Sequence, residues 1–179
     1  MTGSAFEAAN QQPVSTIEMF NVGLKMRERL EEAWSNETAF QGIDIGPDEP
    51  ASRGQCGVSS LWGSRELCRM GYDAKFVEGE VVLGDKPLGG FCWIEVAGII
   101  IDLTSDQYGH SSGSLVYVGG SGEEDTPARY IKQAEWDPFA IPHRKLAQRY
   151  TILEHNLGHA ASRPRRRCLA LLGRISQAL

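Results

Sequence analysis

The hydrophobic pattern of this chain changes its period at Gly71. Over residues 57–70 the apolar side chains recur at helical spacing, and a glycine such as Gly71 commonly follows a helix end. Beyond it, apolar residues alternate with polar ones, which predicts strands over residues 74–83, 91–96 and 99–104. The dipeptide Ala97–Gly98 predicts a tight hairpin turn between the last two strands. The pattern indicates an α+β fold with a helix packed on a small antiparallel sheet.

Further elements are expected on both sides of this segment. Ser15 and Glu18 have the spacing of a capping box, and the apolar residues after them predict a helix over residues 16–35. Residues 115–118 are expected to add a fourth strand, followed by an exposed loop of glycines and acidic residues over 119–125. A C-terminal helix is predicted from the spacing of Leu146, Tyr150, Leu153 and Leu157, with an end at Gly158.

The sequence predicts one domain between two polar ends. Residues 1–14 lack periodicity and are expected to be a disordered leader. Residues 15–158 form the domain, because a chain of 179 residues with 41% hydrophobic content suits a single core. Residues 159–179 are a basic amphipathic tail whose arginines include Arg163–Arg167. Three interpretations of this tail remain open: a solvated end, a contact for anionic lipid or nucleic acid, or a helix that docks on an acidic partner.

Composition argues against several classes of function. A net charge of -5 does not indicate a nucleic-acid-binding surface over the whole protein. The four cysteines and four histidines show no zinc-site spacing, and His155 and His159 lack a carboxylate at matching distance, so no metal is expected. No phosphate-binding loop is present, and no cofactor is predicted. The chain has no signal peptide or membrane-spanning stretch, which favours a cytoplasmic protein with reduced thiols.

Cys56 is the first candidate for chemistry. A loop rich in glycine, proline and aspartate over residues 42–54 precedes it, and the predicted helix follows directly. The positive end of a helix dipole stabilises a thiolate, which is how many reactive cysteines are activated. The alternative is that Cys56 is only a small buried apolar residue, as free cysteines commonly are.

The register of the predicted hairpin suggests where a base would lie. With a two-residue turn, Trp93 faces Asp102, and Asp102 and position 91 become diagonal neighbours on one sheet face. A histidine at position 91 would be oriented by Asp102, but the residue is Phe91, unless a one-residue bulge shifts the strand. Cys92 is expected to point to the opposite face and therefore not to substitute for that histidine.

The order of these motifs resembles the core of the transglutaminase-like and papain-like cysteine superfamily. The matching segments are Gly54–Cys56, Leu67–Ala74, Val77–Gly79, Cys92–Val96 and Ile101–Thr104. The Gly-Gln-Cys start and the Asp-Leu-Thr-Ser-Asp-Gln-Tyr ending are more similar still to a group of uncharacterised bacterial and phage proteins like the YunG family. The resemblance covers about residues 52 to 109.

The resemblance implies a Cys/His/Asp triad that cleaves or transfers an acyl group through a thioester. By this comparison Cys56 is the nucleophile and Asp102 is the orienting carboxylate, while Phe91 stands where the family has histidine. The nearest histidine in sequence is His110, which could replace the base or could be an ordinary solvated loop residue. The candidate substrate-binding residues are Gln55, near the oxyanion, together with Phe91 and Trp93.

Two functional hypotheses follow. The first is a thiol-dependent hydrolase or acyltransferase, degenerate in its base, that acts on an amide or ester bond of a peptide, a protein or a small molecule. The second is a catalytically inactive relative that holds a peptide, a small molecule or a partner protein in the former cleft. Phe91 favours the second, because an apolar ring in the histidine site would close or dry the cleft. Phenylalanine also can neither accept nor donate the proton that acyl transfer requires.

Overall fold

A computed structural model of the chain describes residues 14–40, 43, 45–108, 115–120, 128–140 and 143–162. Residues 161 and 162 are described by their backbone only. The predicted leader up to residue 13, His110 and the arginines from Arg163 onward lie outside the described residues. The elements are α1 (Thr16–Glu31), α2 (Cys56–Arg69), β1 (Ala74–Leu83), β2 (Lys86–Val96), β3 (Ile99–Asp102), the 3-10 helix η1 (Ser105–Tyr108), β4 (Tyr117–Gly120), β5 (Ala128–Trp136) and α3 (Arg144–Ser162).

The strands form one antiparallel sheet in the order β4-β3-β2-β1-β5. The predicted hairpin between β2 and β3 is confirmed, with Val96 opposite Ile99 and Ile94 opposite Ile101. Ala97 and Gly98 have φ values of 50° and 80°, as a two-residue turn of this handedness requires. With helices packed on this sheet, the α+β class is confirmed.

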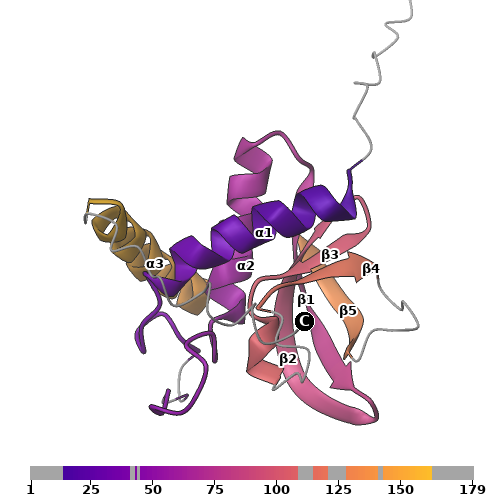
Figure 1. Cartoon of the computed structure of the whole chain (residues 1–179), viewed down its shortest axis with the longest axis horizontal. Coiled ribbons are helices and arrows are strands. Elements are labelled where there is room, and N and C mark those ends of the chain that lie inside the picture. The colour runs from indigo at the N-terminus through magenta and orange to yellow at the C-terminus, as the bar shows by residue number, and fades with distance from the viewer. Residues whose placement is uncertain are drawn as a thin grey trace, which may run out of the picture.

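The helices gather on one side of the sheet (Figure 1). Helix α2 packs on β1 and β2, α1 packs on β3 and β4, and α3 rests on α2 and α1. Gly63 lets α2 approach the sheet closely, because a Cβ there would lie 2.7 Å from Ile94 Cδ1. This close packing therefore fixes the position of α2, with Cys56 at its N-terminus, relative to β2.

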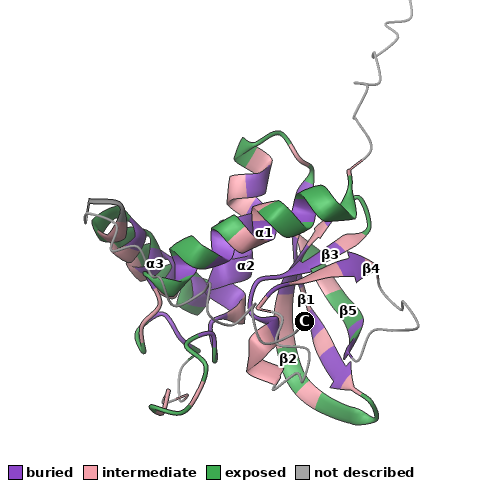
Figure 2. Cartoon of the chain, viewed as in Figure 1, coloured by how far each residue is buried: buried purple, intermediate pink, exposed green. Residues whose placement is uncertain are grey.

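Two clusters of buried side chains lie on opposite faces of the sheet, and Figure 2 shows the buried inner sides of the helices and strands. The larger cluster fills the space between the helices and the sheet and includes Leu61, Phe76 and Ile94. The smaller one is centred on Trp93 and Tyr130. Because neighbouring strand residues point to opposite faces, Phe91 packs with the smaller cluster and Cys92 with the larger.

Several predicted boundaries are wrong. Helix α1 ends at Glu31 rather than at residue 35, and Ser15 precedes it without a side-chain capping hydrogen bond. Strand β2 begins at Lys86, because its polar first half pairs with β1 in a long hairpin. Helix α3 continues past Gly158 to Ser162, so the predicted tail begins inside this helix.

The second half of the sheet also departs from the predictions. Strand β4 covers Tyr117–Gly120, so its two glycines pair with β3 instead of opening the expected loop. Strand β5 was not predicted, because this edge strand carries many charged residues and has little apolar alternation. Among the described residues, no helix combines the length and apolar composition of a membrane span.

Candidate functional site

Cys56 is the first residue of α2, as predicted, and is partly exposed. Its sulfur accepts hydrogen bonds from the Cys92 thiol, from the Cys92 backbone N–H and from the Gly57 backbone N–H. These hydrogen bonds, that of the Cys92 thiol above all, lower the pKa of Cys56, although burial and the negative charge of Asp102 oppose them. The site thus favours a thiolate at Cys56.

Cys92 is the strand residue that faces Cys56. The Ser60 hydroxyl, one helical turn beyond Cys56, donates to the Cys92 carbonyl oxygen over 3.0 Å and holds β2 against the start of α2. The hydrogen bond to Cys56 and burial raise the pKa of Cys92 well above its usual value. The two thiols therefore differ, because the pKa of Cys56 is lowered and that of Cys92 is raised.

Phe91 and Cys92 lie differently with respect to Cys56. Phe91 and Cys92 do point to opposite faces, but Cys56 lies on the face of Cys92. The Phe91 ring packs instead on Tyr108, with centroids 4.7 Å apart. The predicted orientation of Cys92, opposite to that of Phe91, is confirmed, and it is the Cys92 thiol that forms a hydrogen bond with Cys56.

Arg149 approaches the two cysteines from α3. Its Nη2 and the Cys92 sulfur lie 3.7 Å and 3.9 Å from the point where a Cβ on Gly57 would be. Its Nη1 is buried and has no hydrogen-bond partner among the described residues. Burial lowers the pKa of Arg149, and the negative charge that the two cysteines can carry opposes this shift. Sequence reasoning missed this residue, because nothing in the α3 pattern links it to Cys56.

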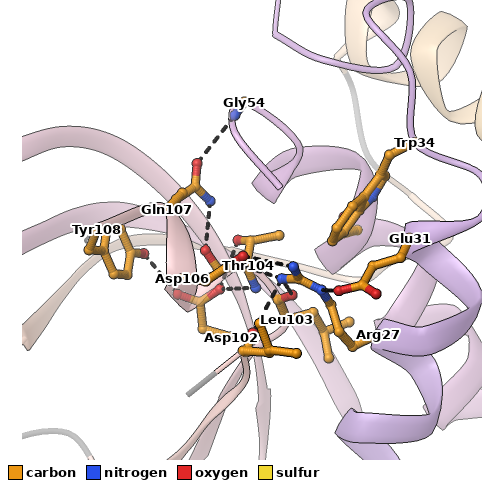
Figure 3. A network of polar contacts seen from close by, with 12 residues as sticks. Arg27, Glu31, Trp34, Gly54, Asp102, Leu103, Thr104, Asp106, Gln107 and Tyr108 are labelled. Carbon is orange, nitrogen blue, oxygen red and sulfur yellow. Dashed lines mark hydrogen bonds and ion pairs between the residues drawn. The ribbon is translucent and has the colours of Figure 1, made fainter. Parts of the chain in front are cut away.

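Asp102 is fully buried and saturated with hydrogen bonds (Figure 3). One carboxylate oxygen accepts from the backbone and hydroxyl of Thr104 at 2.8 Å and 2.9 Å. The other accepts from the hydroxyls of Tyr108 at 2.8 Å and Tyr130 at 3.0 Å. Burial raises the pKa of Asp102, and these four hydrogen bonds oppose the rise. The negative charge of Asp102 also raises the pKa of Cys56. Its role as the partner of a base stays a prediction, because His110 lies outside the described residues.

The remaining part of the Asp-Leu-Thr-Ser-Asp-Gln motif fixes the loop before Cys56. The Gln107 side chain accepts from the Gly54 N–H over 3.2 Å and donates to the Thr104 carbonyl over 3.0 Å. Asp106 receives two hydrogen bonds from Arg27 at 2.7 Å and 2.8 Å, and Figure 3 shows this pair bridging α1 and η1. The motif that carried the family resemblance therefore has a structural role in this chain.

The predicted substrate-binding residues are engaged in packing. Trp93 is 1% exposed, and its ring meets Tyr130 in the smaller cluster. Gln55 is fully buried, and its amide Nε2 donates to the Ser35 carbonyl over 2.9 Å. One proton of this amide is therefore used to join the start of α2 to the segment after α1. A contact of Gln55 with an oxyanion stays a prediction.

The described histidines have partners of their own. His143 lies 3.2 Å from a Glu78 carboxylate oxygen, and the Nε2 atoms of His155 and His159 are 3.1 Å apart on α3. Within the part of the chain that the structure describes, no group of three metal-ligating side chains occurs. His110, the predicted substitute base, falls outside that part.

Comparisons of the chain with protein-family models, with curated proteins and with solved structures find no match. The resemblance to transglutaminase-like proteins therefore rests on the sequence motifs alone. The function has to be argued from the two thiols and the cation beside them.

Proposed function

We propose that this protein is a cysteine-dependent hydrolase or acyltransferase in which Cys56 attacks an amide or ester carbonyl of a peptide, a protein or a small molecule. The observation that carries the proposal is the set of three donors around the Cys56 sulfur at the start of α2. A thiolate is the nucleophilic form of cysteine, and such donors at a helix N-terminus stabilise it.

Cys92 supplies the proton that the reaction needs. The Cys56 sulfur bonds to the carbonyl carbon, the bond to the amine or alcohol breaks, and the leaving group takes the proton of the Cys92 thiol. Water or an acceptor amine then releases the acyl group from Cys56 and returns a proton to Cys92. The hydrogen bond between the two thiols places this donor directly beside the reacting sulfur.

The reaction is expected to be slow in its second half. None of the described histidines makes a hydrogen bond to Cys56, and the loss of one member of a Cys/His/Asp triad removes several orders of magnitude of rate. The acyl group should therefore accumulate on Cys56 and give a burst of the first product.

An activated ester tests the proposal. With 4-nitrophenyl acetate we expect a rapid release of one nitrophenol per protein, followed by slow turnover, and peptide mass mapping should find the acetyl group on Cys56. Cys56→Ser should abolish the burst. Cys68 is a matched control, because it lies at the other end of the same helix, with its thiol donating to the Ala74 carbonyl over 3.4 Å. His110→Ala shows whether that residue contributes to the slow phase.

Equal labelling of Cys56 and Cys68 would contradict the enzyme proposal. It would favour the alternative, an inactive relative that binds a peptide, a small molecule or a partner. That alternative drew its support from Phe91, whose ring packs on Tyr108. The lack of a hydrogen bond from any described histidine to Cys56 also supports it.

A further inference from the structure

Arg149 is a cation without an anion. Its Nη1 is buried and makes no hydrogen bond within the described part of the chain. Among the described residues, the charges found to act on the guanidinium are those that Cys56 and Cys92 can carry. A buried donor without a partner costs free energy, and a charged one costs more. Such a group is retained where a ligand completes it.

The other terminal nitrogen of the guanidinium, Nη2, lies near the two cysteines. Gly57 has no side chain, and a Cβ there would meet Leu146 Cδ1 at 3.2 Å, Arg149 Nη2 at 3.7 Å and Cys92 Sγ at 3.9 Å. The guanidinium and the Cys92 sulfur therefore both pack against the first turn of α2 and border the space beside Gly57. The guanidinium carbon lies 5.5 Å from the centre of the Phe40 ring, which is largely exposed. Phe40 thus marks the side of this space that faces solvent.

The thiolate itself does not satisfy Arg149. The Cys56 sulfur already accepts three hydrogen bonds from Cys92 and Gly57, and Nη1 bonds to neither sulfur. The planar guanidinium suits a carboxylate, whose two oxygens can accept parallel hydrogen bonds from its two terminal nitrogens.

We propose that Arg149 binds a carboxylate of the substrate, so that Cys56 acts on acyl compounds that carry a carboxylate close to the carbon under attack. This inference rests on the proposed function, in which Cys56 is the nucleophile. The short distances around Gly57 limit the separation between the carboxylate and the reacting carbon to a few bonds. Arg149 is then a residue that determines specificity.

Two alkylating agents of nearly equal size test the inference. Iodoacetate carries a carboxylate and iodoacetamide does not, and in both the thiolate bonds to carbon while iodide leaves. The ratio of their rates at one cysteine does not depend on how much of that cysteine is thiolate. Rates at Cys56 and Cys68 are measured separately by peptide mass mapping, with Cys68 as the reference thiol away from Arg149.

We expect the ratio of iodoacetate to iodoacetamide rates at Cys56 to exceed that at Cys68 by roughly ten- to a hundredfold, the usual size of a hydrogen bond to a charged group. Arg149→Gln should lower the ratio at Cys56 to that at Cys68. Arg149→Lys keeps the charge but loses the paired donors, so it should give an intermediate ratio. Circular dichroism checks that the variants fold. If Arg149→Gln does not fold, the ratio of iodoacetate to iodoacetamide rates at Cys56 and at Cys68 in the unaltered protein still tests the inference.

The possible failures are distinguishable. If neither reagent modifies Cys56 faster than Cys68, the proposed nucleophile is wrong and the function proposal fails with it. If Cys56 reacts quickly with both reagents but its ratio equals that of Cys68, the nucleophile stands and the carboxylate inference is overturned. An elevated ratio that survives in Arg149→Gln would also overturn it, because another group would then bind the carboxylate.

Discussion

Arg27 and Arg149 are two arginines with opposite surroundings. Arg27 on α1 is 3% exposed, and its guanidinium donates to Asp106, Glu31 and the Leu103 carbonyl at distances of 2.7–2.8 Å. Burial alone would lower the pKa of Arg27, but its hydrogen bonds and ion pairs raise it. Arg149 on α3 has a buried nitrogen with no partner, and its pKa is lowered.

The difference separates structure from function in this fold. The Arg27 network joins α1, η1 and the loop before Cys56, and its polar groups satisfy one another (Figure 3). Near Cys56, by contrast, Nη1 of Arg149 is buried and has no partner among the described residues. A region that is fully satisfied stabilises the fold, whereas one that retains unpaired groups is poised for a ligand.

The largest effect is expected from Arg27→Ala. This change leaves the Asp106 carboxylate and the Leu103 carbonyl without their donors in a largely buried position. Breaking such a pair should lower the free energy of unfolding by about 3–5 kcal/mol, measured by urea denaturation. A loss below about 1 kcal/mol would show that the network is no more than a surface ion pair.

Tyr108→Phe should have a smaller effect that depends on pH. Burial raises the pKa of Asp102 in the folded protein. Protonated Asp102 therefore contributes to stability in full at a pH below its unfolded-state pKa, and this contribution is lost as the pH rises through its folded-state pKa. The Tyr108 hydroxyl opposes this loss by donating to the ionised carboxylate.

Removing that hydroxyl should therefore cost about 1–3 kcal/mol once Asp102 is ionised and less in acid, where it is protonated. Urea denaturation of both proteins at about pH 8 and about pH 4 measures the difference, because these values lie well above and near the ordinary carboxyl pKa. A cost that is equal at both pH values, or larger in acid, would contradict the assignment of Asp102.

The smallest effect on stability is expected from Arg149→Gln. This variant removes a partly buried cation whose Nη1 has no partner among the described residues. It loses a distant contact with the Phe40 ring and the attraction to any negative charge on Cys56 and Cys92. The free energy of unfolding should change by less than about 1 kcal/mol. A loss as large as that of Arg27→Ala in the same urea titration would break the contrast between the two arginines.

Several helices and strands of the fold could be predicted from the sequence. The helical spacing over 57–70 and the alternation after Gly71 placed α2, β1 and the β2–β3 hairpin, because these elements carry a regular apolar face. The sequence did not predict β5, whose outward charges hide its alternation, or the end of α3, which continues past Gly158 to Ser162.

The site was only half predictable. Cys56 was placed correctly at a helix start, because this depends on local sequence. The choice between Phe91 and Cys92 depends on which sheet face α2 covers, and that is a property of the whole fold. Arg149 lies nearly a hundred residues from Cys56 in sequence, so only tertiary packing brings it to the thiols.

The most direct test of the central claim is the pH dependence of Cys56 alkylation by iodoacetamide in the unaltered protein, in Cys92→Ala and in Cys92→Ser. We predict an apparent pKa below the ordinary cysteine value of about 8.5, because the Cys92 thiol donates to the Cys56 thiolate. Cys92→Ala should raise this pKa, and Cys92→Ser, which keeps a donor, should raise it less. A pKa at or above the ordinary value, or one unchanged in Cys92→Ala, would contradict the claim that the two thiols form the reactive pair.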